Sequence, residues 1–146
     1  MIFRILQIAI PFIWLGLIGG ISFMEAPLKF QAPNITIALG LGIGRLIFFA
    51  LNKIEIVLAI LLLISFIKTK PKRKFPLISF GIIALLLVLE TVWLLPLLDA
   101  RATAVINGIA TPFSNTHFIY IAFEAIKFIL LFALGVSITK NYLKFE

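Results

Sequence analysis

The fold is decided by one stretch of sequence, RLIFFALNKIEIVLAILLLISFI at residues 45–67. A helix needs about 20 apolar residues to cross the ~30 Å hydrocarbon core of a bilayer, and this stretch is long enough. It nevertheless carries the polar residues Arg45, Asn52, Lys53 and Glu55. A charged side chain at the centre of a bilayer costs about 2.5–3.5 kcal/mol even on mild insertion scales. We therefore expect a spanning helix whose polar side chains face the inside of a bundle.

Three further apolar runs, at about 5–23, 75–98 and 117–138, have a similar length. The chain of 146 residues is 62% hydrophobic, and its mean hydropathy of +1.19 exceeds what a soluble domain of this size can bury. The runs are too long for the strands of a membrane barrel. We predict an all-α, polytopic membrane protein with four helices in a single domain, 1–146. The first run has no A-x-A cleavage site after it, so we interpret it as a retained span rather than a signal peptide.

The basic residues predict the orientation. They include Arg4, five side chains at Lys68–Lys74, and the tail residues Lys140 and Lys144, and all of these belong on one side of the membrane. The positive-inside rule then places both termini and the 68–74 loop in the cytoplasm. We expect the loop to contact anionic lipid headgroups, which accounts for the net charge of +7 without nucleic acid. The expected location is the bacterial inner (cytoplasmic) membrane.

The two outer connections, 24–44 and 99–116, are too apolar for loops in water. We expect Pro27 and Pro96 to end the first and third spans, and each connection to lie in the interface or to re-enter the membrane. Glycines recur at Gly40, Gly42 and Gly44 and at Gly16 and Gly20, a spacing typical of close helix packing. For Gly16 and Gly20, this packing is expected within the bundle or across a homodimer.

The two halves of the chain, about 1–70 and 71–146, resemble each other. A shift of 72 residues places Asn52 on Glu124 and Glu55 on Lys127. This pattern predicts a parallel repeat of two-helix units, an arrangement found in some transporters with a site between the repeats. Chance similarity between apolar runs is the alternative.

Polar residues follow stripes on three of the predicted helices. In the fourth span, His117, Tyr120, Glu124 and Lys127 recur at helical spacing. Arg45, Asn52 and Glu55 form a similar stripe on the second span, with Lys53 on a neighbouring face, and Glu90 and Trp93 share a face of the third. Their depths place these groups in the outer half and the centre of the membrane, above an apolar inner half. The pattern predicts a pocket that opens outward or sideways and has a closed floor.

The charges in these stripes leave two interpretations open. Lys53, Lys127 and Arg45 can pair with Glu55, Glu90 and Glu124 and simply lock the bundle. Buried ion pairs stabilise poorly, however, so the same residues also suit a binding site in which His117 and Arg45 guard the outer mouth. One histidine and no cysteine do not make a zinc or haem site, and no cofactor or metal is expected. Trp14 and Tyr142 are interpreted as interface or packing residues.

Two motifs resemble a known family. The stretch Gly19–Phe30 contains Gly20, Phe23, Ala26-Pro27 and Phe30, and Phe113–His117 reads F-x-x-x-H. Both are similar to motifs of the small four-helix membrane family of unknown function that is related to transmembrane protein 205. In that family, Ser and Asn stand three and seven residues after the histidine, where this chain has Tyr120 and Glu124. The resemblance implies four helices and a role in handling small molecules or metals.

These observations favour an integral membrane protein with a polar pocket that binds or transports a small solute, cation or amphiphile. The expected lining is Glu124, Glu90, Asn52, Glu55, Lys127, Lys53, His117, Arg45, Tyr120 and Trp93. A membrane-embedded isomerase or hydrolase that acts on a lipid or sterol through Glu90 or Glu124 is one alternative, by analogy with sterol isomerases and sigma-2-receptor-like proteins. A structural subunit of a membrane complex is the other. Because four spans can hardly enclose a transport path, a homodimer is expected for a transporter.

Overall fold

The computed structural model describes residues 1–143, and these residues form four long helical rods without a strand. The first rod joins α1 (Ile2–Ile18), the π-helix η1 (Gly19–Glu25), α2 (Ala26–Leu28) and the 3-10 helix η2 (Lys29–Gln31), and α3 (Ile37–Lys68) is the second. The third rod joins α4 (Lys74–Leu89), the π-helix η3 (Glu90–Leu94) and α5 (Leu95–Ile106), and α6 (Thr116–Leu143) is the fourth. Lys144, one of the basic tail residues, lies outside the described residues.

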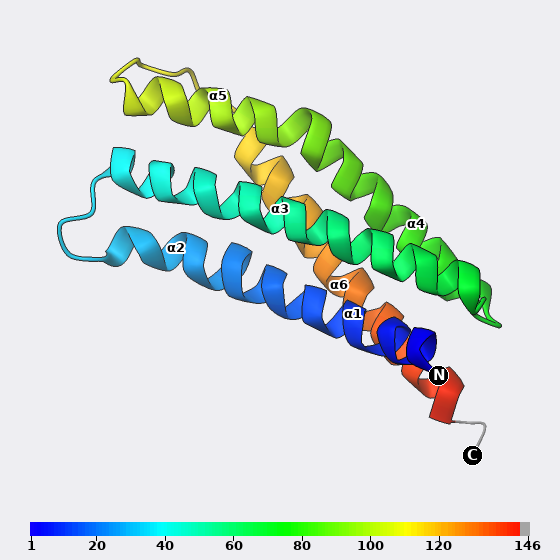
Figure 1. Ribbon diagram of the computed structural model, residues 1–146. Coiled ribbons are helices and arrows are strands. Elements are labelled where there is room, and N and C mark those ends of the chain that lie inside the picture. Colours follow the sequence, from blue (N-terminus) through cyan, green and yellow to red (C-terminus); the bar gives the residue numbers. More distant parts are fainter. Residues whose placement is uncertain (144–146) are drawn as a thin grey trace.

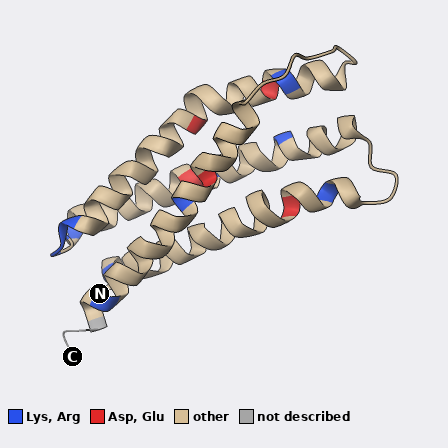
Figure 2. Ribbon diagram, turned by 180° about the vertical axis from the view of Figure 1, so that it is seen from behind, with Lys and Arg blue, Asp and Glu red and all other residues tan. Residues whose placement is uncertain are grey.

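The rods run up and down, so that the N-terminus, the turn at 69–73 and the last turns of α6 lie at one end of the bundle (Figure 1). We call this the inner end, and the end with the 32–36 and 107–115 connections the outer end. α1 packs against α3 and α6, α4 packs against α6, and α5 packs against α3. Charged residues lie near the two ends and near the middle, with uncharged helix between them (Figure 2).

The outward faces carry large apolar side chains. Ile60, Leu85 and Ile129, on three different rods, are each more than half exposed. All four rods contain windows apolar enough to cross a membrane. Because such a surface is stable in lipid rather than in water, the chain is an integral membrane protein with four spanning helices.

The outer connections differ from those expected from the sequence. Helix continues to Gln31 in the first rod and to Ile106 in the third, and α3 already begins at Ile37. The predicted interfacial or re-entrant segments are therefore mostly extensions of the spans themselves. At this end, the connections outside the helices are 32–36 and 107–115. The second begins where α5 ends beside Gly108, whose φ of 75° is in the left-handed region that glycine adopts without strain.

The prediction that Pro27 and Pro96 end their spans is wrong, and the π segments explain why. In an α-helix, a proline lacks the N–H that the carbonyl four residues earlier would accept, and its ring clashes with that carbonyl. Each of these prolines follows a π segment, in which a carbonyl pairs with the N–H five residues on. Ala26 N–H donates to the Ile21 carbonyl, and Leu95 N–H donates to the Glu90 carbonyl. The wider turns carry the helix past both prolines.

The inner half of the bundle is a filled apolar core. Its largest fully buried members include Trp14, Leu62, Ile83 and Leu134, contributed by all four rods. Gly135 lets α1 approach α6, because a Cβ at this position would lie 2.8 Å from the ring of Phe12. In the part of the chain that the structure describes, these buried side chains fill the space between the helices of the inner half.

The glycine predictions have mixed outcomes. Gly40 and Gly44 are buried, and a Cβ on either would collide with Phe30 or Lys29, so both serve close packing of η2 on α3. Gly16 and Gly20 have no described neighbour within 4 Å of an added Cβ, so they do not pack tightly within the bundle. Their role in a homodimer stays a prediction.

Polar residues form hydrogen bonds at the inner end of the bundle. The amide of Gln7 is fully buried and donates to the carbonyls of Ser65 and Thr69, at 2.9 and 2.7 Å, while Tyr142 donates its hydroxyl to Gln7 Oε1 at 2.5 Å. Carbonyls in the last turn of a helix have no partner within it. Gln7 therefore satisfies the end of α3, and Tyr142 both packs against the apolar core, as expected, and donates a hydrogen bond to Gln7.

Candidate functional site

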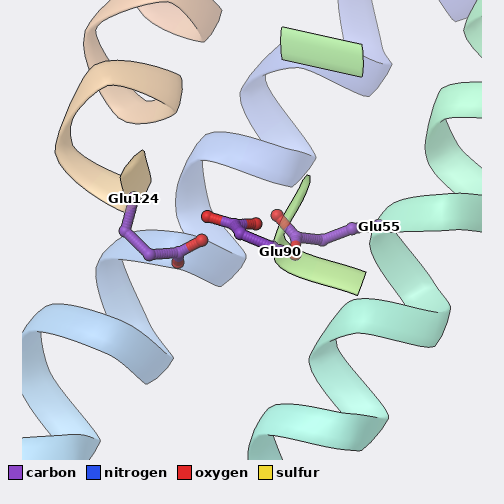
Figure 3. Close-up of side chains that lie close together, drawn as sticks. All are labelled: Glu55, Glu90 and Glu124. Atoms are coloured by element: carbon purple, nitrogen blue, oxygen red, sulfur yellow. The ribbon is translucent and has the colours of Figure 1, made fainter. Parts of the chain in front are cut away.

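Lys127 lies at the centre of the bundle, where it contacts three carboxylates. Its Nζ is 2.7 Å from Glu55 Oε1 on α3, 2.5 Å from Glu90 Oε2 on η3 and 2.6 Å from Glu124 Oε1 one turn earlier on α6. All four side chains are at most 1% exposed. The three carboxyl groups point toward one shared space (Figure 3), where the ammonium donates hydrogen bonds to Glu55 and Glu90 and forms an ion pair with Glu124. We call these four residues the Lys127 cluster.

Two residues of the first rod complete this cluster. Trp14 is fully buried and donates its indole N–H to Glu55 Oε1 at 2.7 Å. Ser22 donates its hydroxyl to Glu124 Oε2 at 2.5 Å. The remaining oxygen of Glu90, Oε1, is buried and has no hydrogen-bond partner in the described part of the chain. All four rods thus supply polar groups at one level of the bundle.

Both π segments place residues of the site. Glu90 begins η3, and Ser22 lies within η1. π-turns within helices are rare and occur often at functional sites, because they turn side chains away from the α-helical register. The same turns explain an error in the sequence analysis, which placed Trp93 on the face of Glu90. A π turn holds more residues than an α turn, so Trp93 points outward and is 46% exposed.

An open cavity lies above the cluster, in the outer half of the bundle. Its volume is about 430 Å³, within the range of small-molecule sites in proteins. The walls are mainly apolar and include Phe23, Phe30, Phe48 and Phe49. Glu124 and Tyr120 line it too, so one carboxyl group belongs both to the Lys127 cluster and to the cavity. The predicted pocket above a filled inner half is present.

Two ion pairs border the cavity toward the outer end. Arg45 Nε donates to Asp99 Oδ1 at 2.5 Å, and Lys29 Nζ lies 3.4 Å from Glu25 Oε2. The Lys29 ammonium also lies over the rings of Phe48 and Phe30, at 5.1 and 5.7 Å from their centroids. These contacts balance positive with negative charge on this side of the cavity.

The structure brings together most of the predicted site residues. Glu55, Glu90, Glu124 and Lys127 form the cluster, and Tyr120, Arg45 and His117 line the cavity. Asn52 is buried but turns to Thr91, to whose Oγ1 it donates at 2.9 Å.

The predicted pairing of Lys53 and Arg45 with the central acids is wrong. Lys53 is exposed, because it lies two residues, or about 200°, from Glu55 around an α-helix. Arg45 pairs with Asp99 instead. The cluster therefore has a single base for three acids within the described residues.

Four residues of this region were not predicted from the sequence: Trp14, Ser22, Thr91 and Asp99. The sequence contains a weak indication for Asp99 alone. It follows Glu90 by nine residues at the outer end of the same predicted span, where an acid can pair with an arginine. The other three resemble ordinary packing or helix-surface residues in the sequence, and only the fold brings them to the carboxylates.

The three glutamates have the spacing of a metal site, with one oxygen of each within 4.8 Å of the others. A carboxylate triad suits a hard cation such as Mg²⁺ or Ca²⁺. Here the Lys127 ammonium contacts all three groups, so the chain supplies its own cation.

Comparison with known proteins does not place the chain in a family. No family model, curated protein or solved structure matches the chain.

Proposed function

We propose that this membrane protein binds a small amphiphilic molecule in the cavity of its outer half, and that this is its function as a ligand-binding or transport protein. The cavity itself carries the proposal: about 430 Å³ of space, walled by phenylalanines, reaches from ion pairs at the outer end to a buried carboxyl group. A mainly apolar site with a few polar groups at its ends favours a ligand with an apolar body and a polar group.

The alternative is a structural lock, in which the charged residues pair only to hold the helices together. This alternative accounts less well for the cavity and the cluster. A lock needs each acid to meet a base, whereas three carboxyl groups share Lys127 and Glu90 Oε1 has no described partner. Buried charges that remain unbalanced destabilise a bundle that apolar residues would fill better. Nor does a lock require a cavity beside Glu124.

The motifs of the family resemblance support the same site. Phe23, Ala26, Pro27 and Phe30 come from the first motif and His117 from the second, and all five line the cavity. We infer from this convergence that the chain is related to the four-helix family of transmembrane protein 205.

We also infer the orientation from the charges. Lys68, Lys70, Arg73 and Lys74 lie at the inner end, which we place in the cytoplasm of a bacterial cell against anionic headgroups. In this orientation, the cavity lies in the outer leaflet of the membrane.

A cavity-filling substitution tests the proposal. Ala102 is buried on α5 and lines the cavity, whereas Ala100 on the same helix is exposed. We expect Ala102→Phe to lose a small molecule that the unchanged protein retains, while Ala100→Phe keeps it. Native mass spectrometry of protein released from gentle detergent, with identification of the retained molecule, measures this. Equal retention by both variants would place the molecule elsewhere and refute the proposal.

An enzyme acting on a lipid would use the same cavity, because Glu124 can meet a ligand there and act as an acid or base. It predicts that the molecule retained by the protein is chemically altered over time. An unaltered molecule favours binding or transport.

A further inference from the structure

The charges of the Lys127 cluster do not balance. If Glu55, Glu90 and Glu124 were all ionised, one ammonium would leave two negative charges uncompensated, in side chains at most 1% exposed. Glu90 Oε1 is buried without a hydrogen-bond partner among the described residues. An uncompensated charge in a low-dielectric interior costs several kcal/mol.

Protons are the simplest compensation. Carboxyl groups that share a buried space neutralise rather than remain ionised together. Lys127 already takes one oxygen of each acid, at 2.5–2.7 Å, which leaves a metal ion to compete with a tethered ammonium. Two protons on three carboxyl groups make the cluster neutral. Any event that brings a positive charge next to the cluster must then displace a proton to keep it neutral.

Glu124 is the member of the cluster that such an event can reach. It lines the cavity, and its Oε2 lies 2.5 Å from Ser22 Oγ. A serine hydroxyl both donates and accepts, so this contact serves an ionised Glu124 as acceptor and a protonated Glu124 as donor. Ser22 therefore supports either state of the carboxyl group.

The cavity walls favour a positive rather than a negative ligand. Their phenylalanine rings attract cations through the ring face, as Lys29 already shows over Phe30 and Phe48. The lysine and the arginine on the cavity wall, Lys29 and Arg45, each have an acid partner. The excess of ionisable acids lies at Glu124 and behind it.

We propose that the cavity takes a lipophilic cation, such as an alkylammonium, and exchanges it for a proton of the Lys127 cluster at Glu124. This inference rests on the proposed binding function and names its ligand class. In the exchange, the O–H bond of the Glu124 carboxyl group breaks, its electron pair stays on the oxygen, and the proton passes to water at the mouth of the cavity. The bound cation then balances the carboxylate, and nothing is oxidised or reduced.

Other titratable groups face the same space and contribute to the pH dependence of the exchange. Within the cluster they are Glu55 from α3, Glu90 from η3 and Lys127 from α6. On the cavity wall they are Lys29, Arg45, Asp99, His117 and Tyr120.

Three probes that carry the same decyl chain but differ in charge test which ligand the cavity prefers: decyltrimethylammonium, decanol and decyl sulfate. The full-length protein is placed in phosphatidylcholine nanodiscs in weak buffer. Native mass spectrometry counts bound probe, and a pH indicator counts released protons. We expect retention of the ammonium probe with release of about one proton per bound molecule. Glu124→Gln should abolish proton release and weaken retention at least tenfold, while Lys53→Gln, at an exposed side chain of α3 outside the cavity, changes neither.

If the Glu124→Gln variant fails to fold, a measurement on the unchanged protein still tests the exchange. Infrared difference spectra should show loss of a protonated carboxyl band when the ammonium probe binds, and no such loss with decanol.

The other outcomes separate this inference from the proposed function. Ammonium binding without proton release overturns the exchange. Stronger retention of decanol or decyl sulfate, lost in Ala102→Phe, overturns the cation class but leaves the binding cavity intact. Proton release by sodium chloride but not by choline chloride would assign the site to a small cation instead. If the cavity retains none of the probes and Ala102→Phe changes nothing, both the inference and the proposed function fail.

Discussion

The inner and outer halves of the bundle are built from the same four rods, yet they differ in how they use their interior. In the inner half, Trp14, Leu62, Ile83 and Leu134 fill the space between helices. In the outer half, a cavity of about 430 Å³ is lined by residues of η1, α2, α3, α5 and α6. The Lys127 cluster lies at the boundary, with apolar core on one side and open space on the other.

The difference shows how a small membrane protein can tolerate a hollow half. Lipid is as apolar as a leucine core, so helices in a membrane associate mainly through packing and hydrogen bonds. The inner half supplies that packing, and the cluster ties α3, η3 and α6 together above it. The outer half therefore remains open while the rods keep their positions.

The largest expected effect is that of Lys127→Met. Removing the one base of the cluster leaves three buried carboxyl groups without their shared donor, and breaking a buried ion pair in this way costs about 3–5 kcal/mol. We expect a large loss of folded protein, measured as the melting temperature in detergent by size-exclusion fluorescence.

Lys53→Met is the matched control on the exposed face of α3. It should change stability by less than about 0.5 kcal/mol, as surface substitutions do. Equal losses in the two variants would show that the Lys127 cluster does not hold α3, η3 and α6 together.

The sequence alone predicts much of this architecture. Runs of about 20 apolar residues indicate the four spans, and the helical spacing of Glu124 and Lys127 indicates that they face the interior. Intramembrane charge is costly, so Glu55 and Glu90 had to find a partner in the bundle. Their convergence on Lys127 confirms that reasoning.

The rest depended on features that periodicity does not reveal. The π segments η1 and η3 carry the helix past Pro27 and Pro96, and they rotate Ser22 toward Glu124 and Trp93 away from the interior. A hydrophobic pattern assumes a constant α-helical turn, so it misplaces every residue beyond such a segment. Trp14 was missed for another reason, since a tryptophan in a span resembles any other packing residue until its N–H is seen to meet Glu55.

The second prediction compares packing in the two halves. Leu134 is fully buried in the inner core, whereas Leu98 lines the cavity and is only partly buried. Leu134→Ala should cost upwards of about 2 kcal/mol, because it opens a void where neighbours cannot relax. Leu98→Ala removes atoms beside an existing space and should cost clearly less.

Thermal melting of the two leucine variants under the same detergent conditions makes the comparison. If Leu98→Ala destabilises the protein as much as Leu134→Ala, the outer half is packed and the cavity closes in the membrane.

The smallest expected effect concerns the inner end, where Tyr142 donates to Gln7 and Gln7 in turn satisfies the last carbonyls of α3. Tyr142→Phe removes one hydrogen bond to a buried amide and should lower stability by about 1 kcal/mol. Thr139→Val is the control, because the hydroxyl of Thr139 donates to the Gly135 carbonyl of its own helix and, among the described residues, links no two rods. Since the inner half is already closed by apolar packing, neither variant should alter ligand retention in the outer cavity. A loss of retention in Tyr142→Phe would mean that the two halves are coupled through α6, and that the filled inner half moves when the outer half binds.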